Sequence, residues 1–124
     1  MDNPVLVPVP AHWTRLLKRR YNQSQALSAA IARISGWDHA PQALVRHRNT
    51  RSQGGLGRDE RFENLVGSIH YKYSKNNDLK GRDVLLIDDV IASGATLSLC
   101  AEQATVAGAQ RVFVLGLARA QMKP

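Results

Sequence analysis

The sequence is poor in cysteine and in acidic side chains, and it has no long apolar run. Cys100 is its only cysteine, which excludes an internal disulfide and a zinc site made of several cysteines. No stretch approaches the roughly 20 apolar residues of a membrane-spanning helix, and the chain does not open with the basic and apolar segments of a secretion signal. We therefore expect a cytoplasmic protein without membrane insertion, with Cys100 as a small core residue of a helix.

Acidic residues are also outnumbered by basic ones. Ten Asp and Glu residues stand against seventeen Lys and Arg residues, which gives a formal net charge of +7. Such an excess favours polyanionic partners, either nucleic acid or a small ligand dense in phosphate. The basic residues concentrate at 15–20 and 46–61. Each cluster can also be a basic face that only contacts solvent. The net charge therefore limits the class of partner but does not identify a partner.

The length of 124 residues suits one compact domain that spans residues 1–124. Stretches with the composition of strands cover residues 5–9, 42–46, 66–73, 84–87 and 111–117, and we expect the third of these at a sheet edge. Helical patterns cover 22–35, 58–65 and 96–107, with a turn at 37–41 and a hydrophilic connection at 74–81. This alternation predicts an α/β fold of three layers with a mostly parallel central sheet.

Two finer expectations concern the first strand and the first helix. Pro8 has no N–H group for a strand ladder, so the first strand is expected to end near it. Asn22 is expected to cap the helix, with Gln25 three residues later in capping-box spacing. The spacing of Leu27, Ile31 and Ile34 predicts that these three side chains form the buried face of the helix.

Chemical groups concentrate between Val84 and Thr96, which reads V-L-L-I-D-D-V-I-A-S-G-A-T. Four consecutive apolar residues predict a strand buried on both faces. Asp88 and Asp89 follow it at the carboxyl end, where open α/β sheets bind ligands. The small residues 92–94 then turn the chain into a helix whose free N–H groups can bind an anion. A ribose 5-phosphate would suit both groups, because its phosphate can accept from the N–H groups while its hydroxyls donate to the carboxylates.

Two other interpretations compete with this one. The two acids can simply be solvated at the end of a buried strand. An apolar strand that ends in Asp also occurs as the Walker B strand of nucleotide hydrolases, which requires a G-x-x-x-x-G-K-[ST] loop elsewhere in the chain. None of the nine glycines is followed by Lys, so the sequence excludes a P-loop.

The stretch 84–96 resembles the signature of type I phosphoribosyltransferases, which bind 5-phosphoribosyl 1-diphosphate (PRPP). Within that superfamily the chain resembles the ComF family, associated with competence and DNA uptake. Further matches are V-P-V-P-A-H at 7–12, Y-N-Q-S at 21–24, the T-x-x-Q-x-x-L-x-x-x-x-R-x-x-N spacing at 50–64 and L-A-R-A at 117–120. The resemblance implies that Asp88 and Asp89 hold the ribose hydroxyls. It implies that the 5-phosphate is bound by Ala92, Ser93, Gly94, Ala95 and Thr96.

The chain departs from the family pattern at three places. Arg20 stands where the family usually has Gly, and Ala92-Ser93 replaces a more usual Thr-Thr. The four-cysteine zinc segment that commonly precedes the domain is expected to be absent. Purine salvage enzymes for 6-oxopurines carry an acid at the position of Ala92, which argues against hypoxanthine or guanine as the acceptor.

The resemblance implies a phosphoribosyltransferase, a glycosyltransferase that transfers a pentosyl group from PRPP to a nitrogen nucleophile through an oxocarbenium-like state. Mg²⁺ is the implied cofactor, held mainly through the ligand and water rather than directly by protein side chains. The expected catalytic residues are Asp88, Asp89, Arg58 and Arg61. The expected pyrophosphate-binding residues are Arg19, Arg20, Arg48 and Arg51.

Glycine and arginine also alternate with polar residues in segment 47–60, which predicts a lid that orders around pyrophosphate. Only residues 1–4 precede the first expected strand and 118–124 follow the last, so we expect little transfer to free nucleobases without a partner or second subunit. Among the four histidines, which have no metal-like spacing, His12 is the best catalytic candidate because it follows the V-P-V-P strand.

A non-catalytic module that binds PRPP or a nucleotide, and acts through DNA or DNA-uptake proteins, is the alternative to an enzyme. The sequence leaves open the acceptor, the protein partners and whether the protein is a homodimer.

Overall fold

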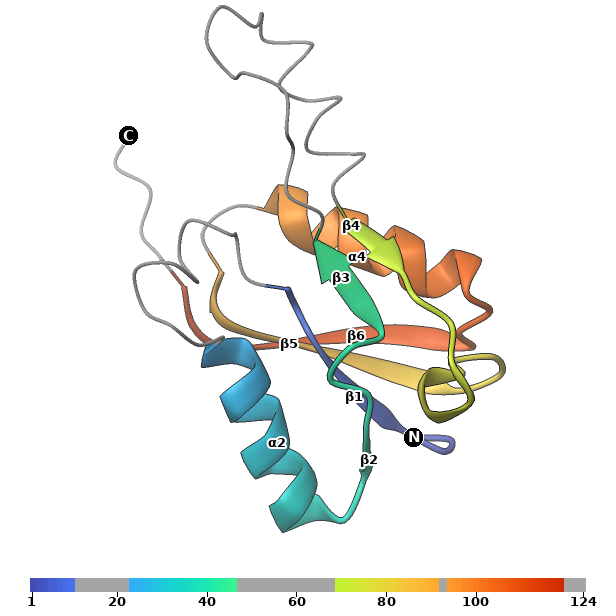
Figure 1. The fold of residues 1–124 in the computed structure, drawn as a ribbon. Coiled ribbons are helices and arrows are strands. Elements are labelled where there is room, and N and C mark those ends of the chain that lie inside the picture. The colour runs from blue at the N-terminus through green and yellow to red at the C-terminus, as the bar shows by residue number, and fades with distance from the viewer. Residues whose placement is uncertain (11–22, 47–68, 92–93, 120–124) are drawn as a thin grey trace, which may run out of the picture.

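The computed structural model describes residues 1–10, 23–46, 69–91 and 94–119. These residues form a four-stranded parallel sheet in the order β2-β1-β5-β6, together with a small antiparallel sheet of β3 and β4 (Figure 1). The strands are β1 (Val5–Pro8), β2 (Asp38–His39), β3 (Leu44–Arg46), β4 (Ile69–Tyr71), β5 (Asp83–Ile91) and β6 (Arg111–Arg119). The helices are α2 (Gln23–Ser35), α4 (Gly94–Val106) and the short 3-10 helix η1 (Lys75–Asn77).

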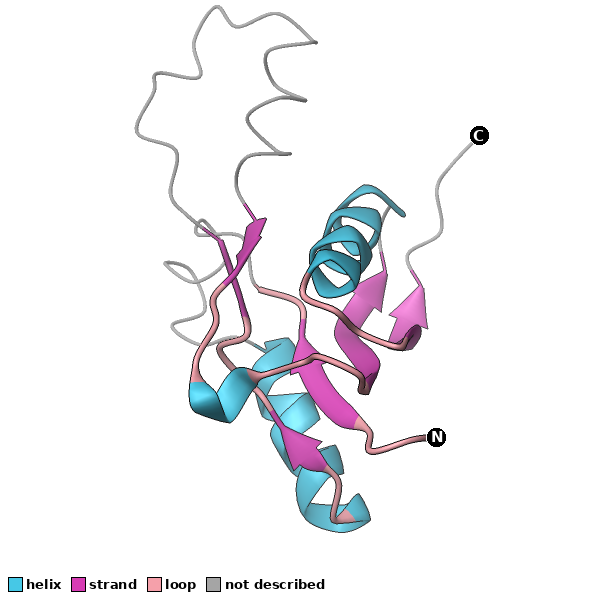
Figure 2. Ribbon diagram, turned by 90° about the vertical axis from the view of Figure 1, so that its right-hand side faces the viewer, coloured by secondary structure: helices cyan, strands magenta, loops and turns pink. Residues whose placement is uncertain are grey.

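The parallel sheet is covered on both faces, and successive residues of its central strands alternate between two apolar clusters. Leu6, Leu85 and Ile87 pack with Leu27 and Ile31 of α2. Residues on the other side of the same strands pack with α4 and the β3–β4 sheet: Val5, Val7, Val84 and Leu86 join Leu44, Ile69, Cys100 and Ala104. Figure 2 shows the helices on opposite sides of the sheet. The predicted three-layer α/β fold is therefore confirmed.

Pro8 lies in a central strand, and the hydrogen-bond pattern explains why it is tolerated. The N–H of Val9 donates to the carbonyl of Ile87 at 2.8 Å, so the nitrogen of Pro8 faces the opposite side, towards β2. Among the described residues, the last hydrogen bond on that side runs from the N–H of Ala40 to the carbonyl of Leu6, at 2.9 Å. Pro8 thus stands beyond the end of β2, and the prediction that β1 ends near it is confirmed.

Helix α2 ends where it was predicted to end but has only part of the predicted buried face, and its predicted cap, Asn22, lies outside the described residues. Gly36 ends it with a φ of 77° and donates its N–H to the carbonyl of Ala32. Ser24 and Ser28 are the buried residues of the helix, whereas Ile34 is 86% exposed. At about 100° per residue, Ile34 lies about 120° around the helix from Ser28. The prediction that Ile34 is buried is wrong. The face of α2 that contacts the sheet is centred on the two small serines, so Ile34 points away from the sheet.

Two strand predictions need correction. Residues 37–41 were expected to form only a turn, but Asp38 and His39 pair with β1 as β2. Segments 42–46 and 66–73 were expected as a second strand of the sheet and an edge strand. Their described parts instead pair with each other, because the register joins Leu44 to Tyr71 and Arg46 to Ile69 in a separate antiparallel sheet. The predicted helix at 58–65 lies outside the described residues.

The remaining elements agree with the predictions, and β5 extends further than predicted. Its nine residues include both Asp88 and Asp89, which were expected after the strand end. Helix α4 buries Cys100 and Ala104 as expected, and Gly108 follows it with a φ of 99°. Within the described part of the chain, strand β6 pairs with β5 alone, and its residues Val114 and Leu115 are about half exposed.

The amino end of β5 carries a buried carboxylate. Asp83 is fully buried, and Arg111 donates to its two oxygens at 3.0 and 2.8 Å. The backbone N–H of Asp2 donates to the same carboxylate at 2.6 Å. The guanidinium of Arg111 lowers the pKa of Asp83, against the opposing effect of its burial. Hydrogen bonds from Arg82 to the carbonyls of Asn3 and Pro4 fix the same N-terminal segment.

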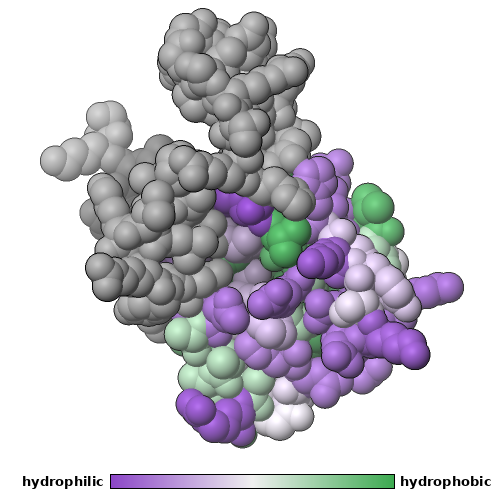
Figure 3. All heavy atoms as spheres, in the orientation of Figure 1, coloured by the Kyte–Doolittle hydropathy of each residue, from purple (hydrophilic) through white to green (hydrophobic). Residues whose placement is uncertain are grey.

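The surface of the described residues is mostly hydrophilic in the view of Figure 3, where apolar residues form separate small patches. Among the described residues, no helix combines the length and apolar character that crossing a membrane would require.

Candidate functional site

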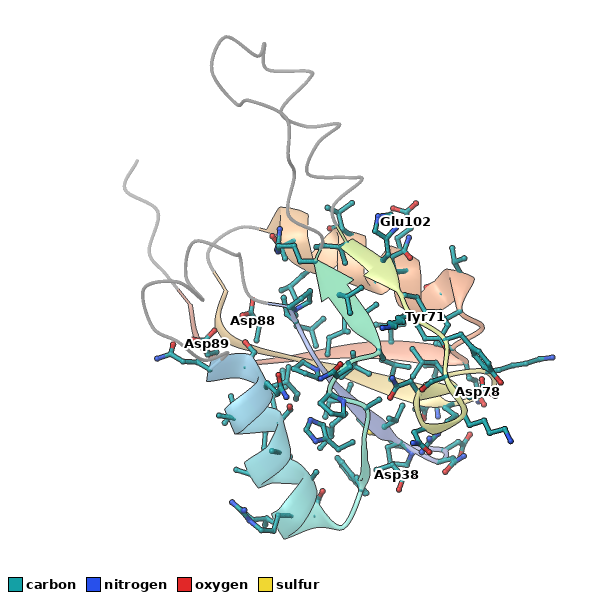
Figure 4. The ribbon with its side chains drawn as sticks, in the orientation of Figure 1. Asp38, Tyr71, Asp78, Asp88, Asp89 and Glu102 are labelled. Carbon is teal, nitrogen blue, oxygen red and sulfur yellow. The ribbon has the colours of Figure 1, made fainter. Side chains whose placement is uncertain are left out.

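Two consecutive carboxylates lie near the carboxyl end of β5. Asp88 and Asp89 are both partly buried, and Asp88 is in register with Gly116 of β6 (Figure 4). Because side chains alternate along a strand, Asp89 lies on the α2 side, like Ile87, and Asp88 lies on the α4 side, like Leu86. The pair therefore lies where both helical layers meet the carboxyl edge of the sheet, the edge at which the sequence predicted it.

Ser24 connects these two acids. It is 4% exposed, and its Oγ lies 3.1 Å from Oδ1 of Asp89 and 3.4 Å from Oδ1 of Asp88. The same oxygen accepts the backbone N–H of Asp89 at 3.1 Å. Ser24 was part of the Y-N-Q-S segment that resembles the ComF family, but no role was predicted for it. The sequence does contain a signal that could have identified Ser24. It is a short polar residue in the first turn of a predicted helix, four residues before another serine.

Helix α4 begins directly after β5 and the two intervening residues. Gly94, Ala95 and Thr96 make up its first turn, where backbone N–H groups have no partner within the helix. No acidic residue lies in that turn, and a side chain added at Gly94 would meet nothing within 4 Å. These N–H groups lie at the positive end of the helix dipole, where an anion is favoured.

Arg46 is a half-buried cation on the α4 side of the sheet. Its Nε is buried, and among the described residues it has neither a hydrogen-bond partner nor an ion-pair partner. Burial lowers the pKa of the Arg46 guanidinium. Burial also raises the pKa of the Cys100 thiol to about 12, with a lowering effect from Arg46 and a raising one from Asp88.

A buried nitrogen without a partner is costly, so Arg46 is suited to receive an anion. It was inside the basic segment 46–61 but was not selected as a site residue. The signal that could have identified it is its position, since it is the charged residue that ends a short apolar strand.

The remaining predicted site residues lie outside the described part of the chain. This holds for Arg19, Arg20, Arg48, Arg51, Arg58, Arg61, Ala92 and Ser93, and for His12 and the predicted lid at 47–60. Their roles stay predictions. Of the described histidines, His39 lies in β2 with its Nε2 2.7 Å from the Oγ of Ser28, and burial lowers its pKa.

Metal-binding groups are sparse in the same region. Among the described residues, no three side chains of His, Cys, Asp or Glu form a cluster that could hold a metal ion. The carboxylates of Asp88 and Asp89 are hard oxygen donors, which suits a cation that takes its other ligands from a bound phosphate compound and from water.

Comparison with known proteins finds relatives along most of the chain. Competence protein F of Haemophilus influenzae is 34% identical over 115 residues, which is 93% of this chain and 50% of that protein. Competence protein ComFC of Bacillus subtilis is 33% identical over 78% of this chain and 36% of its own length. DNA utilization protein YhgH of Escherichia coli is 30% identical over 92% of this chain and 48% of its own length. The chain thus spans half the length of these relatives or less.

A solved structure shares the fold at low sequence identity. The crystal structure of TT1426 from Thermus thermophilus aligns with all of this chain and 77% of its own, at a TM-score of 0.54 and 15% identity. No model of a known protein family matches the chain.

Proposed function

Because the chain belongs to the ComF family and has a phosphoribosyltransferase-like fold, we propose that it is a domain that binds PRPP and transfers its phosphoribosyl group. The process it serves is the use or uptake of DNA in competence, which its relatives' names indicate. The acceptor of the phosphoribosyl group is a nitrogen nucleophile that is not yet identified.

The observation that carries the proposal is the adjacency of two kinds of group at one sheet edge. Asp88 and Asp89 offer hydrogen-bond acceptors, and the first turn of α4 offers hydrogen-bond donors. Few ligands use hydrogen-bond acceptors and donors that lie only a few residues apart in the chain. A ribose 5-phosphate does, since its two vicinal hydroxyls donate and its phosphate accepts. The alternative of two merely solvated acids does not account for the open helix start beside them.

In the proposed reaction the chain's own residues mainly bind and orient PRPP. The carboxylates of Asp88 and Asp89 would accept from the 2- and 3-hydroxyls and hold the sugar, while their negative charge favours the cationic oxocarbenium-like state. Backbone N–H groups of residues 94–96 would bind the 5-phosphate. Mg²⁺, when bound through ligand oxygens and water, would neutralise part of the pyrophosphate charge.

Arg46 would contribute on the leaving-group side. Its guanidinium lies on the α4 side of the sheet, and its buried Nε has no partner among the described residues, so an entering pyrophosphate would supply an acceptor. Six further arginines remain candidates for binding the charged pyrophosphate, as the sequence predicted: Arg19, Arg20, Arg48, Arg51, Arg58 and Arg61.

A second candidate function is a binding module without catalysis. The net charge of +7 and the relatives named for competence and DNA utilization favour it. Such a module would bind PRPP or a nucleotide at the same edge and contact DNA through basic residues. Partner proteins and a homodimer are further proposals that the two functions share.

One set of measurements distinguishes the enzyme from the binding module. Calorimetry with PRPP and Mg²⁺ tests the shared binding step. Pyrophosphate release is then measured with adenine, guanine, hypoxanthine, uracil and orotate, and binding to single-stranded DNA is measured at several salt concentrations. Pyrophosphate release with one base supports the enzyme, and salt-dependent DNA binding without release supports the module. Absence of PRPP binding would contradict both.

A further inference from the structure

Ser24 lies where one hydroxyl can control two carboxylates. It is the second residue of α2, 64 and 65 positions from Asp88 and Asp89 in the chain, and it is almost completely buried. Its Oγ accepts the N–H of Asp89 and lies within hydrogen-bond distance of an oxygen of each acid. These contacts tie the first turn of α2 to the acid pair.

The chemistry of a hydroxyl matters at this position. Ser24 has one hydrogen to donate, so it occupies one lone pair of one carboxylate at a time. An ionised carboxylate has about four lone-pair sites, so this single contact uses only a small part of its acceptor capacity. The guanidinium of Arg111, in contrast, contacts both oxygens of Asp83 and uses far more of that capacity. A hydroxyl can therefore fix the direction of two carboxylates without neutralising them.

We propose that Ser24 is a positioning residue that holds Asp88 and Asp89 as a paired acceptor for two adjacent hydroxyls. It thereby sets the preference of the site for ribose phosphates over 2-deoxyribose phosphates. This inference rests on the proposed function. A ribose can donate to both acids, whereas a 2-deoxyribose leaves one of them without its ligand hydrogen bond, at a cost in affinity.

The chain offers a matched control in Ser28. This serine is one turn further along α2 and is fully buried, but its Oγ donates to the carbonyl of Gln25 at 3.0 Å and lies beside His39. Ser24→Ala and Ser28→Ala each remove a buried hydroxyl from one face of one helix. Only Ser24→Ala removes a contact with the acid pair.

The test is calorimetry on wild type and both variants with three probes, each with Mg²⁺: ribose 5-phosphate, 2-deoxyribose 5-phosphate and inorganic pyrophosphate. In Ser24→Ala the affinity for ribose 5-phosphate should fall roughly tenfold, near the lower limit for the loss of one hydrogen bond to a charged group. Affinity for the deoxy sugar should fall less than about twofold, and affinity for pyrophosphate should not change. Ser28→Ala should match wild type with every probe, and Ser24→Thr, which keeps the hydroxyl, should restore ribose affinity.

Other outcomes overturn the inference in distinguishable ways. Equal losses for all three probes would indicate a general disturbance of α2, and unchanged ribose affinity would show that the acids do not depend on Ser24. A wild-type protein that binds neither sugar phosphate would overturn the proposed function together with the inference. If Ser24→Ala does not fold, as judged by circular dichroism, Ser24→Cys replaces it. Its weaker donor should give a smaller loss with the same preference, and no loss would overturn the inference.

Discussion

Strand β5 carries carboxylates at both ends, and their surroundings differ. At the amino end, Asp83 is fully buried and receives two hydrogen bonds from Arg111. Near the carboxyl end, Asp88 and Asp89 are partly exposed and contact the hydroxyl of Ser24. Breaking a buried ion pair destabilises a fold, whereas partly exposed acids at the carboxyl edge of a sheet are placed to bind a ligand. One strand thus separates a structural use of aspartate from a functional one.

The largest expected effect tests the functional end. Replacing Asp88 and Asp89 together by Asn removes both charges with little change in shape. PRPP affinity, measured by calorimetry, should fall by roughly a hundredfold or more, because two hydrogen bonds to charged groups are weakened. The thermal midpoint should stay the same or rise, since two neighbouring like charges are removed.

Asp78→Asn is the matched control for that change. Asp78 is an exposed acid whose carboxylate accepts the N–H of Lys80 at 3.1 Å, far from the pair in Figure 4. It should alter neither quantity. A double variant that unfolds at a lower temperature with unchanged affinity would place the pair among the structural acids.

The next effect tests the structural end. Arg111→Met leaves the buried carboxylate of Asp83 without its cationic partner, the arrangement that costs a protein most. The thermal midpoint should fall by about 10 °C or more. Affinity of the folded protein for PRPP should remain that of wild type. Arg33→Met, at the exposed last turn of α2, should change the midpoint by about 2 °C at most.

Arg46 gives a smaller effect that sharpens the comparison, because it is a half-buried cation without an ion-pair partner among the described residues. Arg46→Met should reduce pyrophosphate affinity roughly tenfold, since one charged contact is lost. The thermal midpoint should stay the same or rise, because the variant removes a buried nitrogen that has no partner among the described residues. Titration calorimetry and thermal unfolding on the same samples check both. A lower midpoint with wild-type affinity would assign Arg46 to the structural group.

The smallest effect is a pH dependence that belongs to Asp83. Arg111 holds the pKa of this carboxyl below its usual range in the folded protein. A depressed carboxyl pKa contributes stability above the ordinary value of about 3.9, and that stability is lost as the pH falls from there through the folded-state pKa. Urea unfolding between pH 7 and pH 3 should show this loss in wild type. Asp83→Asn should lack this component and show a flatter profile below about pH 4.

The sequence predicted the sheet edge that carries the acids because the determinants there are local. An unbroken apolar run, two acids and a glycine turn define the strand end and the helix start without knowledge of distant residues. The alternation of strand and helix patterns was sufficient for the three-layer arrangement for the same reason. Strand β5 was underestimated because acidic residues have low strand propensity, yet pairing with β6 extends it to Ile91.

Other features depend on contacts between distant segments. Asp38 and His39 form a strand only because β1 lies beside them, and β3 joins β4 rather than the parallel sheet. Ser24 contacts acids that lie far from it in the chain, so no local pattern encodes these contacts. The same holds for the buried nitrogen of Arg46, which lacks a partner among the described residues. The exposure of Ile34 likewise follows from which side of α2 meets the sheet.

The hydrogen bonds around Asp83 also have a practical use. They fix residues 2–4 at the amino end of the sheet, and the first residue lies at the far side of the molecule from Asp88 and Asp89 (Figures 1 and 4). Met1 is 56% exposed, so a chemical group attached to it would lie in solvent. A biotin or surface linker at this position would orient every immobilised molecule with its acid pair towards the solution. Binding of phosphate compounds or DNA could then be followed on a sensor surface without the support blocking that edge.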